Sequence, residues 1–226
     1  MDWQEEKDEL VKRNALAQNL GGADKIERQH KGGRLTVRER IDQILDPDSF
    51  QEIGALAGAF GYDESGNIVE HSPTNCVMGR GRINGQPIVI SGDDFTVRGG
   101  SADATIWEKA KYPETMANEL RLPIVRLIEG SGGGGSVKTI ETKGRANLPG
   151  GLGNTSGFDI LAENMATVPV VGLGLGSVAG LGAARLAASH YSVLVKDIGA
   201  MFVAGPPGGK HIGEDLDKQE LGGHAI

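Results

Sequence analysis

Residues 172–189 read GLGLGSVAGLGAARLAAS and follow the short apolar run TVPVV at residues 167–171. This order predicts a strand, then a turn crowded with glycine, then the start of an alanine-rich helix. A turn of this kind can hold a pyrophosphate, a nucleophilic side chain or an oxygen atom of a substrate. Each possibility predicts a different enzyme, so the rest of the chain has to decide between them.

Composition sets the first limits on function. The chain has 226 residues, 36 of them glycine, a formal net charge of −7 and a pI near 5.3. Nucleic-acid binding needs a basic face, so we expect no nucleic-acid partner. A single cysteine, Cys76, excludes an internal disulfide and a cysteine-based zinc ribbon. No apolar run approaches the roughly 20 residues that span a bilayer, and the N-terminus is too acidic for a signal peptide. We therefore expect a soluble protein of the cytoplasm, or of the mitochondrial matrix for a processed eukaryotic chain, without a membrane partner.

The first fifty residues predict an N-terminal helical arm. Residues 2–20 are charged, with apolar residues at helical spacing, and Gly21-Gly22 end the pattern. A second helix is expected over residues 36–45, because Thr36 can cap it and Glu39 stands at the capping-box position. The arm is expected to be either a solvated surface or a grip on a neighbouring subunit.

Residues 51–226 predict one layered α/β domain. The sequence CVMGRGRINGQPIVISGDD from Cys76 predicts a hairpin that turns at Asn84-Gly85. Apolar strands, glycine-rich loops and helices then alternate, with one helix expected to start near Ser101. Glycine loops at strand ends gather on one edge of a sheet, which is where α/β folds bind ligands. The polar segment 136–157 is long for a connection and is expected to be either a lid or a surface excursion.

The glycine turn itself leaves several interpretations. Gly174, Gly176 and Ala179 fit the dinucleotide fingerprint G-x-G-x-x-G/A, and Asp197 stands near the spacing of its ribose-binding acid. No serine has glycine on both sides at the spacing of a nucleophile elbow, and the phosphate-loop pattern near residues 204–210 lacks its first glycine. The five histidines share no metal-ligand spacing. A further possibility is that backbone N–H groups of the turn form an oxyanion hole, which needs room rather than a particular side chain. Alternatively, Gly180 and Gly182 only let the helix pack closely on the sheet.

Several stretches together resemble one family. The stretches are residues 34–50 (RLTVRERIDQILDPDSF), 91–101 (SGDDFTVRGGS), 121–133 (RLPIVRLIEGSGG), 201–207 (MFVAGPP) and 220–223 (ELGG). In order and spacing they resemble the carboxyltransferase (β) subunit of biotin-dependent acyl-CoA carboxylases. These are the propionyl-CoA and methylcrotonyl-CoA carboxylases. The resemblance covers the N-terminal half of such subunits.

The resemblance implies a crotonase-like ββα superhelix and a reaction. Carboxylate passes from N1-carboxybiotin, carried on a separate domain or protein, to the α-carbon of an acyl-CoA through an enolate. The family's "AGG" turn matches residues 179–181, so the backbone N–H groups of Gly180 and Leu181 are expected to bind the thioester oxygen. The CoA and biotin pocket is expected to include Phe95, Gly99, Gly100, Gly132, Gly133, Gly134, Gly205 and Pro206. No metal is expected in this chain.

The resemblance also implies partners. These are an acyl-CoA, a biotin carboxyl carrier protein, a biotin carboxylase subunit and a C-terminal carboxyltransferase half, within a homo-oligomer of the trimer or hexamer type. Family members continue with a second, related domain that is absent from this sequence, so we expect the chain alone to be poorly active. Leu181 in place of the family's second glycine and the altered "DSGGA" stretch after Glu129 leave the acyl group open.

Three functions therefore stay open at this stage. The first is half of a carboxyltransferase, working in the carboxylating or the decarboxylating direction. The second is a crotonase-fold hydratase, isomerase or decarboxylase with a carboxylate base, for which the candidates are Asp93, Asp94, Glu129 and Glu163. The third is a non-catalytic assembly domain in which the Leu181 side chain fills the hole.

Overall fold

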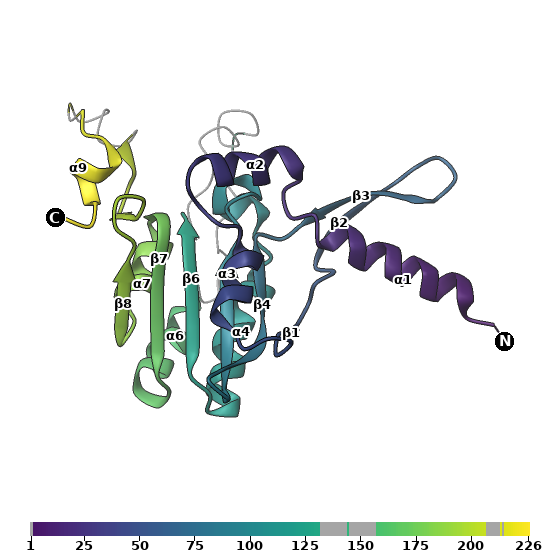
Figure 1. Cartoon of the computed structure of the whole chain (residues 1–226), viewed down its shortest axis with the longest axis horizontal. Helices are drawn as coiled ribbons and strands as arrows, with labels where there is room; N and C mark the ends of the chain where they lie inside the picture. The colour runs from purple at the N-terminus through teal and green to yellow at the C-terminus, as the bar shows by residue number, and fades with distance from the viewer. Residues whose placement is uncertain (1, 132–143, 145–156, 207–212, 214) are drawn as a thin grey trace.

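In the described part of the chain, a seven-stranded mixed sheet has helices on both of its faces (Figure 1). The computed structural model describes residues 2–131, 144, 157–206, 213 and 215–226. Its strands follow the order β1-β4-β5-β6-β7-β8, and β9 pairs with the end of β7. Their bounds are β1 Gln51–Glu52, β4 Cys76–Ile83, β5 Gln86–Asp93, β6 Ile124–Gly130, β7 Val170–Ala179, β8 Tyr191–Leu194 and β9 Ala200–Phe202. The α/β prediction is confirmed.

Strand direction divides the sheet into two parts. β1, β4 and β5 pair antiparallel, whereas β5, β6, β7 and β8 pair parallel, with β9 also parallel to β7. Parallel neighbours require crossover connections, and helices supply them. The carboxyl ends of the parallel strands therefore lie at one edge of the sheet, which is the edge that the sequence assigned to ligand binding.

The predicted hairpin at Asn84-Gly85 is confirmed. β4 and β5 pair from Cys76 with Asp93 to Ile83 with Gln86, so the loop has two residues. Asn84 and Gly85 both have positive φ, at 50° and 79°, as a type I′ turn requires. The Asp46 carboxylate accepts hydrogen bonds from both loop N–H groups at 2.8 and 2.7 Å, which fixes the hairpin to the end of the N-terminal helices.

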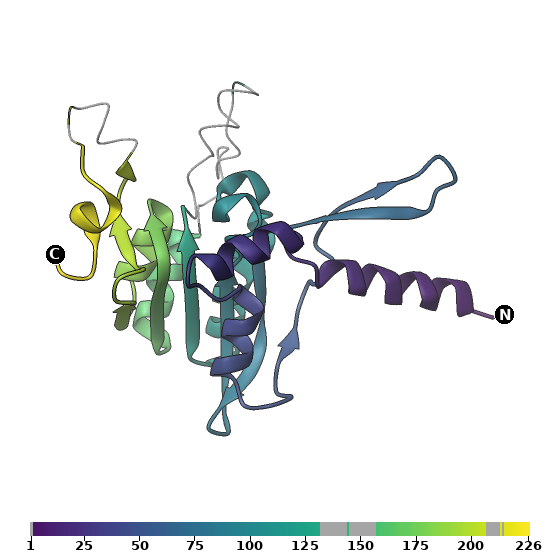
Figure 2. The ribbon, with the colours of Figure 1, turned by 45° about the horizontal axis from the view of Figure 1, so that its top comes forward.

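The N-terminal helices differ in what they contact. α1 (Gln4–Ala17) extends away from the sheet beside the hairpin of β2 (Gly58–Tyr62) and β3 (Ile68–Pro73), as Figures 1 and 2 show. α2 (Ala23–Lys31) and α3 (Val37–Ile44) instead lie over the sheet. Val37 and Ile41 share a buried cluster with apolar residues of β4, β5 and β6. The predicted capping box of Thr36 and Glu39 is present at the start of α3.

Among the residues that the structure describes, the opposite face carries α4 (Trp107–Leu120), α6 (Phe158–Thr167) and α7 (Leu181–Ala187). The short α9 (Lys218–Gly222) lies near the C-terminus. The helix expected from Ser101 begins later, at Trp107. Arg98, Gly99 and Gly100 adopt positive φ in one 3₁₀ turn, and Ala102–Ala104 form a second 3₁₀ turn, so the α-helix does not start there. No helix in the described part of the chain is long and apolar enough to cross a membrane.

The opening glycine run proves to be strand rather than turn. β7 extends through Gly172, Gly174 and Gly176 to Ala179, and only Gly180 turns the chain into α7. An added Cβ at Gly172 or Gly174 would approach Leu186 of α7 at 3.0 or 2.8 Å, so these glycines make room for the helix. The dinucleotide interpretation is therefore wrong, because a fingerprint loop needs its glycines at the helix N-terminus.

Candidate active site

The carboxyl edge of the parallel strands brings together most of the predicted site residues that the structure describes. β5 ends at Asp93, β6 at Gly130 and β7 at Ala179. The loop after β5 carries Phe95, Gly99 and Gly100, and the turn after β7 carries Gly180 and Leu181. Gly132, Gly133 and Gly134 lie outside the described residues. The remaining candidates, Gly205 and Pro206, follow β9, whose end pairs with the last residues of β7.

The turn after β7 requires glycine. Gly180 has φ 55° and ψ −120°, a conformation that a side chain disfavours, and it caps α7. Its N–H donates to the carbonyl oxygens of Phe202 and Val203, both at 3.1 Å. A substrate oxygen at Gly180 would have to displace these carbonyls. The N–H of Leu181, by contrast, has no backbone acceptor among the described residues, which leaves it available as a donor.

Two glycine backbones meet where the loop after β5 reaches the end of β6. An added Cβ on Gly130 would lie 2.8 Å from the Gly100 Cα, and one on Gly100 would lie 3.1 Å from the Gly130 Cα. Both residues also have positive φ, at 64° for Gly100 and 112° for Gly130. Gly130 in turn pairs with Val178, two residues before Gly180. The predicted loop and the predicted turn therefore share one continuous backbone surface.

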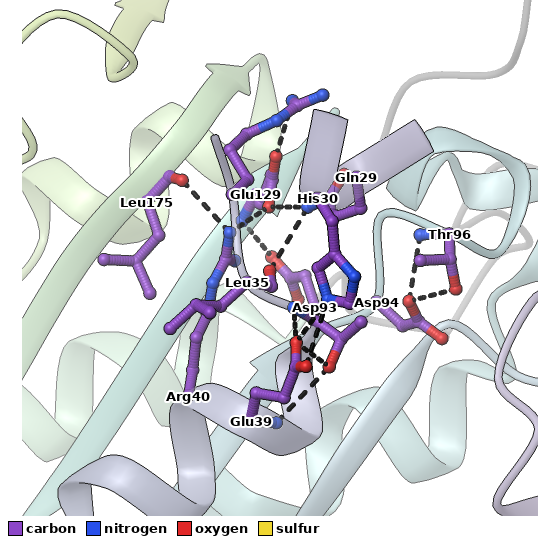
Figure 3. Close-up of polar contacts among 12 residues, drawn as sticks. Gln29, His30, Leu35, Glu39, Arg40, Asp93, Asp94, Thr96, Glu129 and Leu175 are labelled. Atoms are coloured by element: carbon purple, nitrogen blue, oxygen red, sulfur yellow. Dashed lines mark hydrogen bonds and ion pairs between the residues drawn. The ribbon is translucent and has the colours of Figure 1, made fainter. Parts of the chain in front are cut away.

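A buried carboxylate fastens the N-terminal helices to this edge. Glu129 is fully buried, and its oxygens accept from Arg34 Nη1 at 2.8 Å, Arg40 Nη2 at 2.7 Å and Gln29 Nε2 at 2.9 Å. The Arg40 guanidinium also donates to the carbonyl of Leu175 at 3.2 Å (Figure 3). A buried carboxylate is tolerated when cations and donors fill its oxygens, as they do here.

The strand opposite Glu129 is shaped to admit it. The pairing of β6 with β7 shifts register between Ile128 and Gly130, so extra residues of β7 bulge at this point. An added Cβ on Gly176 would lie 2.6 Å from the Glu129 carboxyl carbon. The third glycine of the run therefore makes room for the carboxylate. Sequence reasoning missed this network, although Arg126 and Glu129 stand out as charges inside the apolar run of β6.

The four candidate carboxylate bases occupy different environments. Glu129 is held by two arginines, and Asp93 is paired with Arg185 Nη1 at 3.0 Å. Glu163 is exposed on α6. Burial raises the pKa of Asp94, and its Oδ2 has no hydrogen-bond partner among the described residues, whereas Oδ1 accepts from Thr96.

This arrangement offers little to a reaction that needs a carboxylate base. Two of the four candidates, Asp93 and Glu129, are paired with arginine, Glu163 is exposed on α6, and Asp94 is only 1% exposed. A general base has to reach the proton that it removes. The edge instead offers backbone donors and glycine-lined space.

Comparison with known proteins identifies the family. The sequence profile of the carboxyl transferase domain matches residues 28–226. The chain belongs to the carboxyl transferase domain family. The resemblance seen in the sequence is thus confirmed, and residues 28–44, which carry the Arg34 and Arg40 contacts to Glu129, are part of the matched domain.

The relatives of this carboxyl transferase domain include acyl-CoA enzymes. The chain is 32% identical to the human mitochondrial propionyl-CoA carboxylase beta chain over 212 residues, which covers 90% of this chain and 36% of that protein. It is 31% identical to the methylmalonyl-CoA carboxyltransferase 12S subunit of Propionibacterium freudenreichii subsp. shermanii over 225 residues, covering 96% of this chain and 40% of the other.

Solved structures agree. Transcarboxylase 12S, solved as a hexamer assembly with methylmalonyl-CoA and methylmalonic acid bound, matches all of this chain and 42% of its own at 26% identity, with a TM-score of 0.78. The beta subunit of geranyl-CoA carboxylase from P. aeruginosa matches 99% of this chain and 38% of its own at 27% identity, with a TM-score of 0.65. The crotonase-like prediction is confirmed. The chain spans about two fifths of the length of these relatives.

No group of three His, Cys, Asp or Glu side chains that could hold a metal ion occurs among the residues that the structure describes. The buried thiol of Cys76 also has its pKa raised to about 11 by burial, so it stays protonated and a poor ligand at neutral pH.

Proposed function

We propose that the chain is the acyl-CoA-binding, N-terminal part of a biotin-dependent acyl-CoA carboxyltransferase. One observation carries this proposal: the whole chain superposes on transcarboxylase 12S, a protein solved with methylmalonyl-CoA bound. The match to a carboxyl transferase domain over residues 28–226 points the same way. In the proposed reaction, biotin on a separate carrier supplies the carboxyl group, and this chain binds and orients the acyl-CoA.

The chemical task of the chain is to stabilise negative charge on the thioester oxygen. Loss of the α-proton from an acyl-CoA turns its carbonyl oxygen into an enolate oxygen. A backbone donor aimed at that oxygen lowers the barrier, and removing one such donor typically costs about 2.7–4 kcal/mol. The available Leu181 N–H is the first donor that we propose, and the Gly180 N–H becomes a second if the oxygen replaces the Phe202 and Val203 carbonyls.

A second protein segment completes the proposed enzyme. The chain covers 36–42% of each relative described above, so the biotin-side donors would come from a C-terminal half. We propose a biotin carboxyl carrier protein and a biotin carboxylase subunit as further partners, within a homo-oligomer. Transcarboxylase 12S itself assembles as a hexamer.

Calorimetric titration with acetyl-, propionyl- and methylcrotonyl-CoA tests the proposal, with NAD as the control ligand. Binding of at least one CoA thioester is expected, without binding of NAD. The Gly180→Ala variant should lose this binding because its turn needs φ 55°. Gly66→Ala is the matched control, because Gly66 also has positive φ, at 83°, but lies in the β2–β3 hairpin with open space around it. Binding of NAD alone, or of no thioester at all, would contradict the proposal.

A further inference from the structure

An ion pair between Arg185 and Asp93 joins the helix that follows the Gly180 turn to the end of β5. Arg185 Nη1 lies 3.0 Å from Asp93 Oδ1 and 3.3 Å from Asp93 Oδ2. The two side chains are largely buried, with 15% and 12% of their surfaces exposed. Burying two charges costs free energy that their attraction only partly offsets, so such a pair is weak evidence for a purely stabilising role.

The Asp93 carboxylate contacts three elements that meet at the carboxyl edge of the sheet. Asp93 is the last residue of β5, and its Oδ2 accepts a hydrogen bond from the Glu129 N–H of β6 at 3.4 Å. Its oxygens also accept from Arg185 of α7. These elements lead into, or out of, the loop after β5, the end of β6 and the Gly180 turn. One carboxylate therefore joins the three backbone segments of the candidate site.

Helix α7 depends on contacts of this kind for its position. It has seven residues, and its N-cap, Gly180, makes no side-chain cap hydrogen bond. A helix this short is not stable alone, so packing against other elements has to place it. Arg185 is the only charged residue of α7, so no other side chain of this helix can form an ion pair with the sheet.

The Arg185 side chain is connected to the proposed donor through the helix. Leu181 and Arg185 are four residues apart, so they share one face of α7, and helical side chains lean toward the N-terminus. The other contacts of α7 lie elsewhere: Arg126 donates to the Arg185 carbonyl at 3.0 Å, and Leu186 packs in an apolar cluster. The ion pair with Asp93 therefore restrains the rotation of the helix face that begins with Leu181.

We propose that Asp93 and Arg185 are positioning residues, whose ion pair holds the first turn of α7 so that the Leu181 N–H points at the thioester oxygen. This inference rests on the proposed function and adds two side chains that act without touching the substrate. A hydrogen bond weakens steeply as it departs from linearity, so a small rotation of α7 should remove much of the contribution of this donor.

The test compares two ligands that differ at one atom. Propionyl-CoA carries the thioester oxygen, whereas its thioether analogue S-propyl-CoA lacks that oxygen and keeps the rest of the molecule. The ratio of their affinities, measured by calorimetry, reports the contact with the oxygen, because damage to the fold lowers both affinities together. Infrared spectra of propionyl-CoA labelled with ¹³C at the carbonyl give a second measurement, since a hydrogen bond lowers the stretching frequency of this group.

The variants separate geometry from charge. They are Asp93→Asn, Arg185→Met, the double variant Asp93→Asn/Arg185→Met, and Arg185→Lys, which keeps the cation. Arg38→Met/Glu52→Gln is the matched control, because this ion pair is buried to a similar degree, at 18% and 14% exposed, and joins α3 to β1 instead.

We expect the wild-type chain to bind propionyl-CoA about two- to tenfold more tightly than S-propyl-CoA, as one hydrogen bond allows. Each single variant should bring this ratio close to one and raise the carbonyl frequency, and the double variant should lower the ratio no further. Arg185→Lys and the control should keep the wild-type ratio.

Several results would overturn the inference while leaving CoA binding by the chain intact. One is an unchanged ratio in both single variants. Another is a change of opposite sign in Asp93→Asn and Arg185→Met, because an effect of charge alone reverses with the charge removed. A parallel loss of both affinities would show that the pair only supports the fold. Equal binding of the two ligands by the wild type removes the donor and the inference together, and binding of neither ligand contradicts the proposed function itself.

Discussion

Strand β6 carries two buried charges on opposite faces, and they are held in different ways. Glu129 faces α2 and α3 and binds two arginines from a segment about 95 residues earlier in the chain. Arg126 faces α4 and α7; it binds Glu114 through two hydrogen bonds of 2.7 and 2.9 Å and donates to the Arg185 and Ala188 carbonyls. One charge therefore attaches the N-terminal helices, while the other supports the helix that follows the Gly180 turn.

The comparison shows how one strand can position two separate parts of a site. The Arg126 contacts reach the C-terminal end of α7, so they fix the helix whose first residue is Leu181. The Glu129 contacts fix Arg34, whose guanidinium carbon lies 5.0 Å from the centre of the Phe95 ring in the loop after β5. Losing the first network should disturb the core, and losing the second should mainly loosen the N-terminal helices.

Replacing Arg126 should give the largest effect. Arg126→Met leaves the buried Glu114 carboxylate without its cation, and breaking a buried pair in this way typically costs about 3–5 kcal/mol of unfolding free energy. Urea denaturation measures the change. The double variant Glu114→Leu/Arg126→Met removes both charges and should recover more than half of the loss. Equal stability of the single and double variants would show that the unpaired Glu114 carboxylate is not the cause of the loss.

Replacing Glu129 should lower the free energy of unfolding less than replacing Arg126, but it should loosen the N-terminal helices. In Glu129→Gln one oxygen still accepts a hydrogen bond, and Arg34 can reach water, so we expect a loss of about 1.5–3 kcal/mol. Trypsin should also cleave faster after Arg28, Lys31 or Arg34, as mass spectrometry would reveal. Glu52→Gln, which breaks the Arg38 pair on the same segment, is the control. Faster cleavage in the control than in Glu129→Gln would contradict the role given to Glu129.

A methyl group at Gly176 of β7 should disturb only the contacts of Glu129 with the N-terminal helices. Gly176→Ala places a Cβ against the Glu129 carboxylate, and overpacking of this kind costs about 1–3 kcal/mol. Thermal unfolding and the trypsin assay should therefore change together. Gly174→Ala instead meets Leu186 and Leu194 on the other side, so its unfolding temperature should fall without faster cleavage of the N-terminal helices. Identical cleavage of the Gly176→Ala and Gly174→Ala variants would contradict the assignment of Gly176 to the Glu129 network and of Gly174 to the packing of Leu186 and Leu194.

The smallest effect is expected from Asp94 and depends on pH. Burial raises its folded-state pKa above the ordinary 3.8, so the folded protein binds this proton more tightly than the unfolded chain. Wild-type stability should then fall as pH rises from about 3.8 through the folded pKa, by at most about 1.4 kcal/mol per pH unit. Asp94→Asn removes this contribution, so its advantage over wild type should grow from pH 4 to pH 7 in calorimetric scans. An advantage that shrinks over this range would contradict the assignment.

Local signals predicted the parts of the fold that depend on neighbours in sequence. The Asn84-Gly85 turn and the Thr36–Glu39 capping box are each set within a few residues, and both are present. Glycine usually marks turns, so the glycine run predicts a turn. In the structure these glycines lie in strand β7, where the absence of a Cβ leaves room for Leu186 of α7 and for the Glu129 carboxylate of β6. The residues that require glycine at these positions lie on other elements, so no local sequence pattern predicts them.

The family motifs predicted which backbone segments form the candidate site, whereas the pairing of its buried charges was not predicted. The family motifs placed the loop after β5 and the turn after β7, which share the carboxyl edge of the sheet. The contact between Arg34 and Glu129 joins residues far apart in sequence, so periodicity could not reveal it. The available signal was the pair Arg126 and Glu129 inside an otherwise apolar strand, since charges there need partners.

The span between Arg34 and Glu129 also sets an order of events during folding. The hairpin of β4 and β5 closes over two residues, whereas the N-terminal helices are fixed by a carboxylate about 95 residues downstream. Long loops close slowly and late, because the entropy of closure is lost before the contact forms. On the ribosome, Arg34 and Arg40 emerge well before Glu129. The N-terminal helices are therefore synthesised before the carboxylate that binds Arg34 and Arg40, and these two contacts form only after β6 has been made.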